Sequence, residues 1–180
     1  NPFRVIKPFK IDKKRQRYYF TKSDINMIMK SSRKFKDFYA FLLNTGVRAT
    51  DAYKLSKKHI NGSYLTLKMN KTGDYLNIPL SRQIIELIES KIDGDLIFPE
   101  VQSDRQRRNC IRNVQRLFKP EFVRENYITL HTFRHTYAHN MLDKGTPKEI
   151  LQSLLGHRSI KTTEIYANWV KTKELEKWVI

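Results

Sequence analysis

The chain has 180 residues, a length that fits one domain, and 39% of them are hydrophobic, enough for a buried core. It carries 35 Lys and Arg against 18 Asp and Glu, a formal charge of +17, which favours a polyanionic partner: nucleic acid first and an anionic membrane second. No apolar run is long enough to span a membrane and no signal peptide opens the chain; one cysteine, Cys110, excludes a disulfide framework and suits a reducing cytoplasm.

The sequence has none of the motifs that hold a metal or a nucleotide. Cys and His do not cluster as in a zinc site, and the carboxylates do not gather as in a magnesium site. Lys71-Thr72-Gly73 lacks the upstream glycine of a phosphate-binding loop. We therefore expect no cofactor.

Residues 1–20 contain two prolines and a run of Lys and Arg, which favours a linker or an extended arm over a helix. This arm is either a solvated terminus or a DNA contact. A helix is expected next, from the N-cap Thr21, with Asp24 in its first turn, to about Ser31.

A second helix is predicted over 33–45, where apolar residues, many of them aromatic, recur at helical spacing, and Gly46 is its expected C-cap. A further helical turn is expected over 49–55. Arg48 lies between the two, where it is either a surface charge or a functional group.

Apolar and polar residues alternate over 64–80 on both sides of a turn at 70–74, which predicts a β-hairpin. Lys71 lies at its tip. It serves either solubility, as exposed tip lysines commonly do, or the delivery of an ammonium group to a phosphate.

Ser81 is the expected cap of the next helix, and the chain breaks away from that helix at 94–99. A helix over 104–119 is expected to follow, with one apolar stripe. A second stripe consists of four arginines at spacings of three, four and four: Arg105, Arg108, Arg112 and Arg116. A stripe of a single sign favours a track for DNA phosphates over simple solubility.

Three helices are expected in the last third of the chain. The first runs from Leu130 to about Lys144, and the second covers 148–155 and ends at a glycine. The third carries Tyr166 and is expected to be capped by Thr162 or Thr163.

Four polar side chains in this region are not required by apolar packing: His131, Arg134, His157 and Tyr166. They supply one phosphate binder, two proton carriers and one nucleophile, which is close to a full set for cutting a phosphodiester without a metal. Tyr166 is one of nine tyrosines, so an interfacial aromatic is the alternative. Three further histidines are expected to be structural: His59, His135 and His139.

Together these segments resemble the tyrosine recombinases of the phage integrase family. The resemblance rests on five boxes: residues 45–51 around Arg48, 70–73 around Lys71, 131–135 around Arg134, 155–157 ending at His157, and 162–166 ending at Tyr166. All five occur in family order and at family-like separations, over about residues 18–170, and together they favour functional roles for Arg48 and Lys71. Asp51 stands where many members have glutamate, in a position expected to buttress rather than react.

The resemblance implies an α+β fold, mostly α-helical with a small antiparallel sheet or hairpin. Residues 21–169 would form the catalytic domain, after the arm 1–20 and before a tail, 170–180, that presents Trp178 to its own domain or to a neighbouring protomer. Family members usually carry a helical DNA-binding domain ahead of the catalytic one. This chain shows no such domain, and we infer a piece of a longer protein.

The resemblance also implies a role for each catalytic residue. Arg48 and Arg134 would clamp the non-bridging phosphate oxygens with planar, bidentate geometry, and His157 would donate a further hydrogen bond. Tyr166 would attack phosphorus after His131 takes its proton, and Lys71 would protonate the departing 5′ oxygen. The product would be a 3′-phosphotyrosine, formed without metal or ATP.

The sequence is thus interpreted as the catalytic domain of a site-specific recombinase or integrase that acts on double-stranded DNA. A homotetramer assembled through the tail is expected, in the cytoplasm and nucleoid of a prokaryote, or for a phage or mobile element. One alternative is a type IB topoisomerase-like enzyme that nicks, lets the DNA swivel and reseals. Another is a DNA-binding regulator that kept the fold and lost catalysis.

Overall fold

The computed structural model describes residues 17–91, 94–164 and 166. Its helices are α1 (Lys22–Ser31), α2 (Lys36–Thr45), α3 (Ala49–Ala52), α4 (Arg82–Glu89), α5 (Asp104–Gln115), α6 (Pro120–Asn126), α7 (His131–Asp143) and α8 (Lys148–Leu155), with two 3-10 turns, η1 (Lys57–His59) and η2 (Pro99–Val101). Its strands are β1 (Ile60–Asn61), β2 (Tyr64–Lys68) and β3 (Tyr75–Pro79). The expected α+β class, mostly helical with a small antiparallel sheet, is confirmed.

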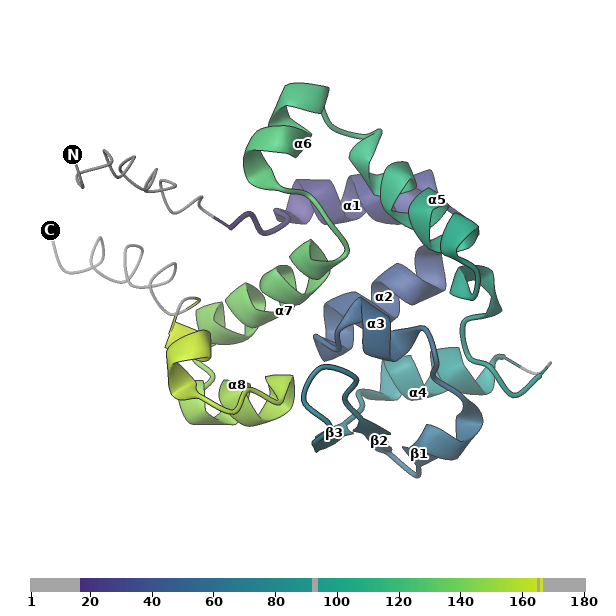
Figure 1. The fold of residues 1–180 in the computed structure, drawn as a ribbon, viewed down its shortest axis with the longest axis vertical. Coiled ribbons are helices and arrows are strands. Elements are labelled where there is room, and N and C mark those ends of the chain that lie inside the picture. Colours follow the sequence, from purple (N-terminus) through teal and green to yellow (C-terminus); the bar gives the residue numbers. More distant parts are fainter. Residues whose placement is uncertain (1–16, 92–93, 165, 167–180) are drawn as a thin grey trace, which may run out of the picture.

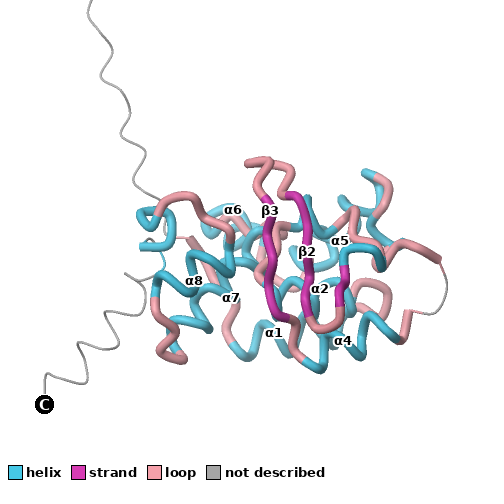
Figure 2. Tube along the Cα trace, turned by 90° about the horizontal axis from the view of Figure 1, so that it is seen from below, coloured by secondary structure: helices cyan, strands magenta, loops and turns pink. Residues whose placement is uncertain are grey.

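The sheet lies at one edge of the helical body (Figures 1 and 2). Its strands are ordered β1-β2-β3, and both pairs are antiparallel. Leu65 and Leu67 alternate with exposed residues along β2, as Leu76 and Ile78 do along β3, so one face of the hairpin joins the core. Because β3 also contacts α8, the hairpin reaches the part of the fold that carries the last two boxes.

Local signals in the sequence fix several helix ends where they were predicted. Thr21 and Asp24 form a capping box at the start of α1. Gly46 ends α2 and Gly156 follows α8, both with left-handed backbone that a glycine adopts without strain. Ser81 occupies the N-cap position of α4, although its side chain makes no capping hydrogen bond.

Other boundaries differ from the prediction. The helix expected over 104–119 ends at Gln115, and a separate helix, α6, begins at Pro120, because proline is well suited to the first turn of a new helix. The strand β1 was not predicted. Thr162 and Thr163 do not cap the helix that carries Tyr166, since residues 160–164 are already helical and Thr162 N donates to the carbonyl of Ser159.

The helix α7 is the central, buried helix of the domain. Every residue from 132 to 139 is buried, and α2 packs along this helix. The Phe133 ring stacks on Tyr39 of α2 and meets the edge of Phe20. The amide of Phe20 donates to Thr136 Oγ1 at 2.9 Å, so the end of the expected arm packs against the domain. The tail, 170–180, lies outside the described residues.

The turn after α2 packs closely against α7 at Gly46. Gly46 has φ +64°, and a Cβ added there would lie 2.3 Å from Cδ1 of the buried Tyr137. Gly46→Ala should therefore lower the free energy of unfolding by about 2–4 kcal/mol, through left-handed strain and overpacking together. Urea denaturation followed by circular dichroism measures this loss.

Gly62→Ala is the matched control. Gly62 has φ +56° but no atom within 4 Å of an added Cβ, so only the strain of about 1–2 kcal/mol applies. Equal losses in the two variants would show that the contact with Tyr137 carries no weight.

Candidate active site

The guanidinium of Arg134 lies at the centre of the site. It is buried on α7, with 2% of its surface exposed. Nη1 donates to the carbonyl of Gly46 at 2.9 Å and Nη2 to the carbonyl of Leu155 at 2.7 Å, which joins the C-terminal ends of α2 and α8. Its Nε is buried and makes no hydrogen bond within the described part of the chain, so this donor has no partner there.

Arg48 enters the site from the N-cap of α3. Its Nη1 lies 3.2 Å from Sδ of Met69, at the base of the hairpin turn, and 3.9 Å from Oδ2 of Asp51. Oδ1 of Asp51 accepts from the backbone N–H of Asn70 at 2.9 Å. Asp51 thus holds the first arginine box and the base of the hairpin tip together.

Lys71 is exposed at the tip of the hairpin. The tip closes through two backbone hydrogen bonds, from Met69 N to Asp74 O and from Gly73 N to Met69 O, each 2.9 Å. The charge of Lys71 contributes to lowering the pKa of His131, so the hairpin places the ammonium group close enough to interact electrostatically with this histidine of α7.

His157 follows the left-handed Gly156. Its Nδ1 lies 2.9 Å from Oγ1 of the buried Thr163, and this contact orients the ring. Gly156 packs directly on the hairpin, because a Cβ there would lie 2.7 Å from Sδ of Met69. The same methionine therefore contacts both the Arg48 guanidinium and the backbone beside His157.

Tyr166 is buried, with 1% of its surface exposed, and contacts the segments that carry His135 and His157. Its hydroxyl lies 3.1 Å from Nδ1 of His135, and its ring is nearly parallel to that of His157, with centroids 6.2 Å apart. The edge of the His135 ring meets His131, with centroids 4.7 Å apart. In this arrangement His135 contacts the phenol directly, whereas the sequence prediction gave the proton-acceptor role to His131.

The electrostatics of the site are dominated by cations. Desolvation, followed by the charges of Arg134 and Arg48, lowers the pKa of His131 to about 4 and that of His157 to about 3. Burial, with the positive surroundings, likewise lowers the pKa of His135 to about 3. The three rings are neutral at neutral pH. Burial lowers the pKa of Arg134 to about 10, so this side chain stays charged.

Two opposing effects act on the phenol of Tyr166. Burial raises its pKa, and the charges of Arg134 and Arg17 lower it, with a net rise. Arg17 belongs to the segment predicted as a linker or extended arm. An anionic phenolate at this position would be stabilised by two cations, although the resting group is a neutral phenol.

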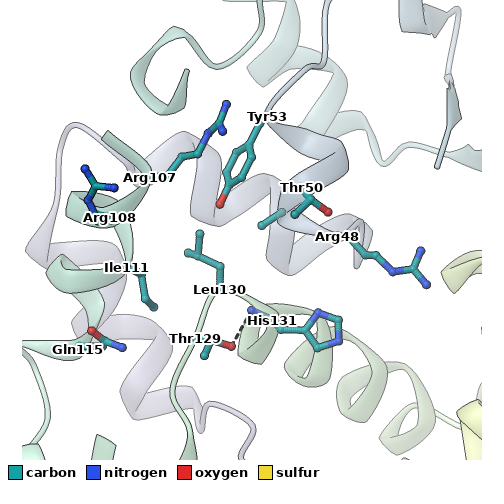
Figure 3. A pocket seen from close by; sticks show the side chains of 11 residues that line it. Arg48, Thr50, Tyr53, Arg107, Arg108, Ile111, Gln115, Thr129, Leu130 and His131 are labelled. Carbon is teal, nitrogen blue, oxygen red and sulfur yellow. Dashed lines mark hydrogen bonds between the residues drawn. The ribbon is translucent and has the colours of Figure 1, made fainter. Parts of the chain in front are cut away.

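A hollow of about 500 Å³ adjoins the site (Figure 3). Its apolar lining includes Ile111 and Leu130, while Arg48 and His131 extend to one side and Arg108 lies on the other. Arg107 is committed to the fold: its guanidinium stacks 4.4 Å from the Tyr53 ring centroid and donates to two backbone carbonyls. Arg108 is the exposed cation of this wall.

The predicted basic stripe has four exposed members, Arg105, Arg108, Arg112 and Arg116. The first three lie on α5, and Arg116 is its C-cap residue. Cys110 and Val114 on the same helix are buried, so α5 separates an apolar side from a charged one.

Several residues of the site were missed by reasoning from the sequence. His135 and Thr163 lie inside two of the five boxes, so their positions in the sequence already indicated that they lie near the site. Met69 and Arg17 belong to no box, and only the fold brings them to the site. His59 lies apart, where its ring accepts from the backbone N–H of Ser56.

The described ranges contain no group of three His, Cys, Asp or Glu side chains placed to hold a metal ion. None of the helices in the described part of the chain is long and apolar enough to cross a membrane.

The low pKa of His135 predicts an acid-sensitive fold. An unfolded histidine binds its proton near pH 6.5, whereas folded His135 binds it near pH 3, so the unfolded state holds more protons between these values. The free energy of unfolding should therefore fall as the pH drops from about 7. His135→Asn should make this fall shallower between pH 7 and 5, as measured by urea denaturation at each pH. An unchanged slope would contradict the shift.

Comparisons with known proteins identify the family. The sequence profile of the phage integrase family matches residues 19–173. Tyrosine recombinase XerA of Pyrococcus furiosus is 30% identical over 164 residues, which cover 86% of this chain and 57% of that protein. The chain thus spans little more than half the length of this curated relative.

Solved structures share the fold. The catalytic domain of bacteriophage HP1 integrase matches with a TM-score of 0.67 at 20% identity, over 84% of this chain and 88% of that one. XerH site-specific recombinase, in a post-cleavage complex with a palindromic difH substrate, matches with a TM-score of 0.65 at 21% identity, over 92% of this chain and 53% of that one. With a family profile that spans most of its length, the chain belongs to the phage integrase family of tyrosine recombinases.

Proposed function

We propose that this chain is the catalytic domain of a DNA strand-transfer enzyme, a site-specific recombinase or integrase. The observation that carries the proposal is the setting of Tyr166. A buried tyrosine hydroxyl lies 3.1 Å from an imidazole nitrogen, beside a second imidazole and within the field of a buried arginine. Structural packing alone does not call for this set of groups.

Phosphate binding is assigned to the two arginines and His157. Phosphodiesters resist nucleophiles because their oxygens are negative, so catalysis requires fixed positive groups at the non-bridging oxygens. Among the described residues, the buried Nε–H of Arg134 has no partner, and Arg48 makes weak contacts with a sulfur at 3.2 Å and a carboxylate at 3.9 Å. When the Thr163 hydroxyl donates to Nδ1 of His157, Nε2–H is left as a further donor.

Tyr166 Oη forms the bond to phosphorus, and the bond from phosphorus to the 5′ oxygen breaks. The phenol proton passes to an imidazole, and the ammonium of Lys71 protonates the departing oxygen, so charge and protons balance. We assign the role of proton acceptor to His131. Its ring contacts the ring of His135, whose Nδ1 lies within hydrogen-bond distance of the phenol hydroxyl. Attack on the phosphotyrosine by a different 5′-hydroxyl completes strand transfer.

Double-stranded DNA is the proposed partner. The charge of +17 and the exposed arginines of α5 support it. The related structures of XerH and of lambda integrase were solved with DNA sites, which supports the same partner here. Assembly of a homotetramer through the tail 170–180, and action on a chromosome, phage or mobile element, extend this proposal to the whole protein.

Tyr166→Phe should abolish covalent adduct formation and leave DNA affinity nearly unchanged, because it removes the nucleophilic oxygen but keeps the ring that packs on His157. The measurement is a suicide trap, in which cleavage of nicked duplexes with randomised arms releases a short strand and cannot reverse. A denaturation-resistant adduct is then scored on a gel. An adduct formed by the variant would exclude Tyr166 as the nucleophile.

Replacing Arg105, Arg108 and Arg112 by Gln should weaken DNA binding at every sequence. It should also flatten the plot of log affinity against log salt concentration by about 1–3 units of slope, because each lost phosphate contact is worth roughly 0.9. Fluorescence anisotropy at several salt concentrations measures this slope.

A triple variant of Lys57, Lys58 and Arg82, all exposed and all changed to Gln, matches the loss of charge on a different surface. If the salt slope falls by the same amount in both triple variants, the arginines of α5 do not form a specific binding surface for DNA phosphates.

A further inference from the structure

An arginine that belongs to none of the catalytic roles joins two catalytic segments. Arg158, the residue after His157, reaches across to the hairpin tip, 84 positions away in the sequence. Its Nε lies 2.7 Å and its Nη2 2.9 Å from the two carboxylate oxygens of Asp74. Nη2 also donates to the carbonyl of Thr72 at 2.7 Å. These three contacts all fall on the turn that presents Lys71.

Few other contacts with the described residues hold the hairpin tip to the rest of the domain. Its base is held by the bonds of Asn70 to Asp51 and to the carbonyl of Thr50. Gly73 has left-handed backbone, and an added Cβ there would meet no atom within 4 Å. Arg158 therefore adds attachments at Thr72 and Asp74 to those that Asp51 and Thr50 provide at Asn70.

This ion pair is suited to orientation rather than to stability. Both side chains are well exposed, Arg158 by 66% and Asp74 by 43%, and exposed pairs contribute little to folding. A bidentate fork, however, fixes the relative position of its two partners in a way that a single contact does not. The hydrogen bond from Arg158 also keeps the pKa of Asp74 below its usual range, so the pair stays charged at neutral pH.

Orientation matters for the group that this turn carries. Proton transfer requires the donor to lie within hydrogen-bond reach of the leaving oxygen, and small displacements cost large factors in rate. A lysine on an exposed turn has a flexible side chain, so the backbone of the turn must supply the precision. His157 and Lys71 would otherwise be placed by separate segments.

We propose that Arg158 is a positioning residue, which clamps the hairpin through Asp74 and Thr72 and thereby places Lys71 over the leaving oxygen. The inference rests on the proposed strand cleavage and on the role of Lys71 in it. It predicts a defect in one chemical step, protonation of the leaving group, with DNA binding and nucleophilic attack unaffected. A direct contact of Arg158 with a DNA phosphate is the competing explanation.

The first test needs no DNA. In the full chain, hydrogen exchange at the amides of residues 69–74 should become faster in Arg158→Gln and in Asp74→Asn, while the amides of α7 keep their protection. Arg82→Gln, which breaks the exposed pair with Glu86 on α4, is the matched control and should leave the hairpin unchanged. Unchanged exchange in both hairpin variants would overturn the clamp.

The second test separates the chemical steps. Cleavage is compared on duplexes from the adduct trap that carry either the normal 5′ oxygen or a bridging 5′ sulfur, whose thiolate leaves without a proton. Arg158→Gln and Asp74→Asn should each cut the oxygen substrate about 10-fold more slowly or worse, and the sulfur substrate within about 2-fold of the unmodified chain. Equal losses on both substrates would overturn the positioning role.

The two single variants and one exchange variant distinguish the clamp from a phosphate contact. The clamp predicts that Asp74→Asn and Arg158→Gln act in the same direction, and that exchanging the two residues, Arg158→Asp with Asp74→Arg, restores part of the rate. A phosphate contact predicts the opposite for Asp74→Asn, since loss of a negative charge would strengthen DNA binding.

Lys71→Ala shows whether the proposed function itself has failed. If this variant cleaves both substrates more slowly by the same factor, Lys71 is not the proton donor, and the role assigned to Arg158 is excluded with it. If the unmodified chain forms no adduct, the proposed function fails, and hydrogen exchange still decides whether Arg158 orders the hairpin.

Discussion

The burial of one positive charge organises this domain. A guanidinium almost fully removed from water needs hydrogen-bond acceptors, and Arg134 finds them at the C-terminal ends of two helices, where free carbonyls carry partial negative charge. The turns after α2 and α8 must therefore approach α7 together. Since Arg48 follows the first turn and His157 follows the second, the acceptors that stabilise Arg134 also bring the segments of Arg48 and His157 to it.

Core and active site consequently share one helix. Most buried helices are apolar on all sides, but α7 buries Thr132, Arg134, His135, Thr136 and His139 along with Phe133 and Ala138. Each polar group needs a partner, and several partners lie on distant segments, such as the Phe20 amide for Thr136 and the Tyr166 hydroxyl for His135. Substitutions on α7 should thus affect folding and catalysis together, whereas hairpin residues such as Lys71 can be changed at little cost to stability.

The sequence predicts what is encoded locally. Glycine at helix ends, the capping box at Thr21 and the alternation in the hairpin depend on neighbours within a few positions, and the structure agrees with each of them. The division at Pro120 was missed because the apolar spacing continues across it. The pairing of Arg158 with Asp74 could not be predicted, because no local pattern relates residues 84 positions apart. The contact of His135 with the Tyr166 hydroxyl was not predicted for a similar reason, since this partner is set by the fold and not by the box that contains His135.

The charges of the site also determine its protonation. With desolvation, the two arginines hold the pKa values of His131 and His157 far below normal, so the site contains cations and neutral rings. A bound phosphodiester brings a negative charge into this field and offsets the arginines that depress the histidines. The pKa values of the rings must then rise, which makes them better proton acceptors when a substrate is present. In the proposed mechanism, the cations that bind the phosphate also keep the histidines unprotonated until it arrives, so no separate switch is needed to couple binding to proton transfer.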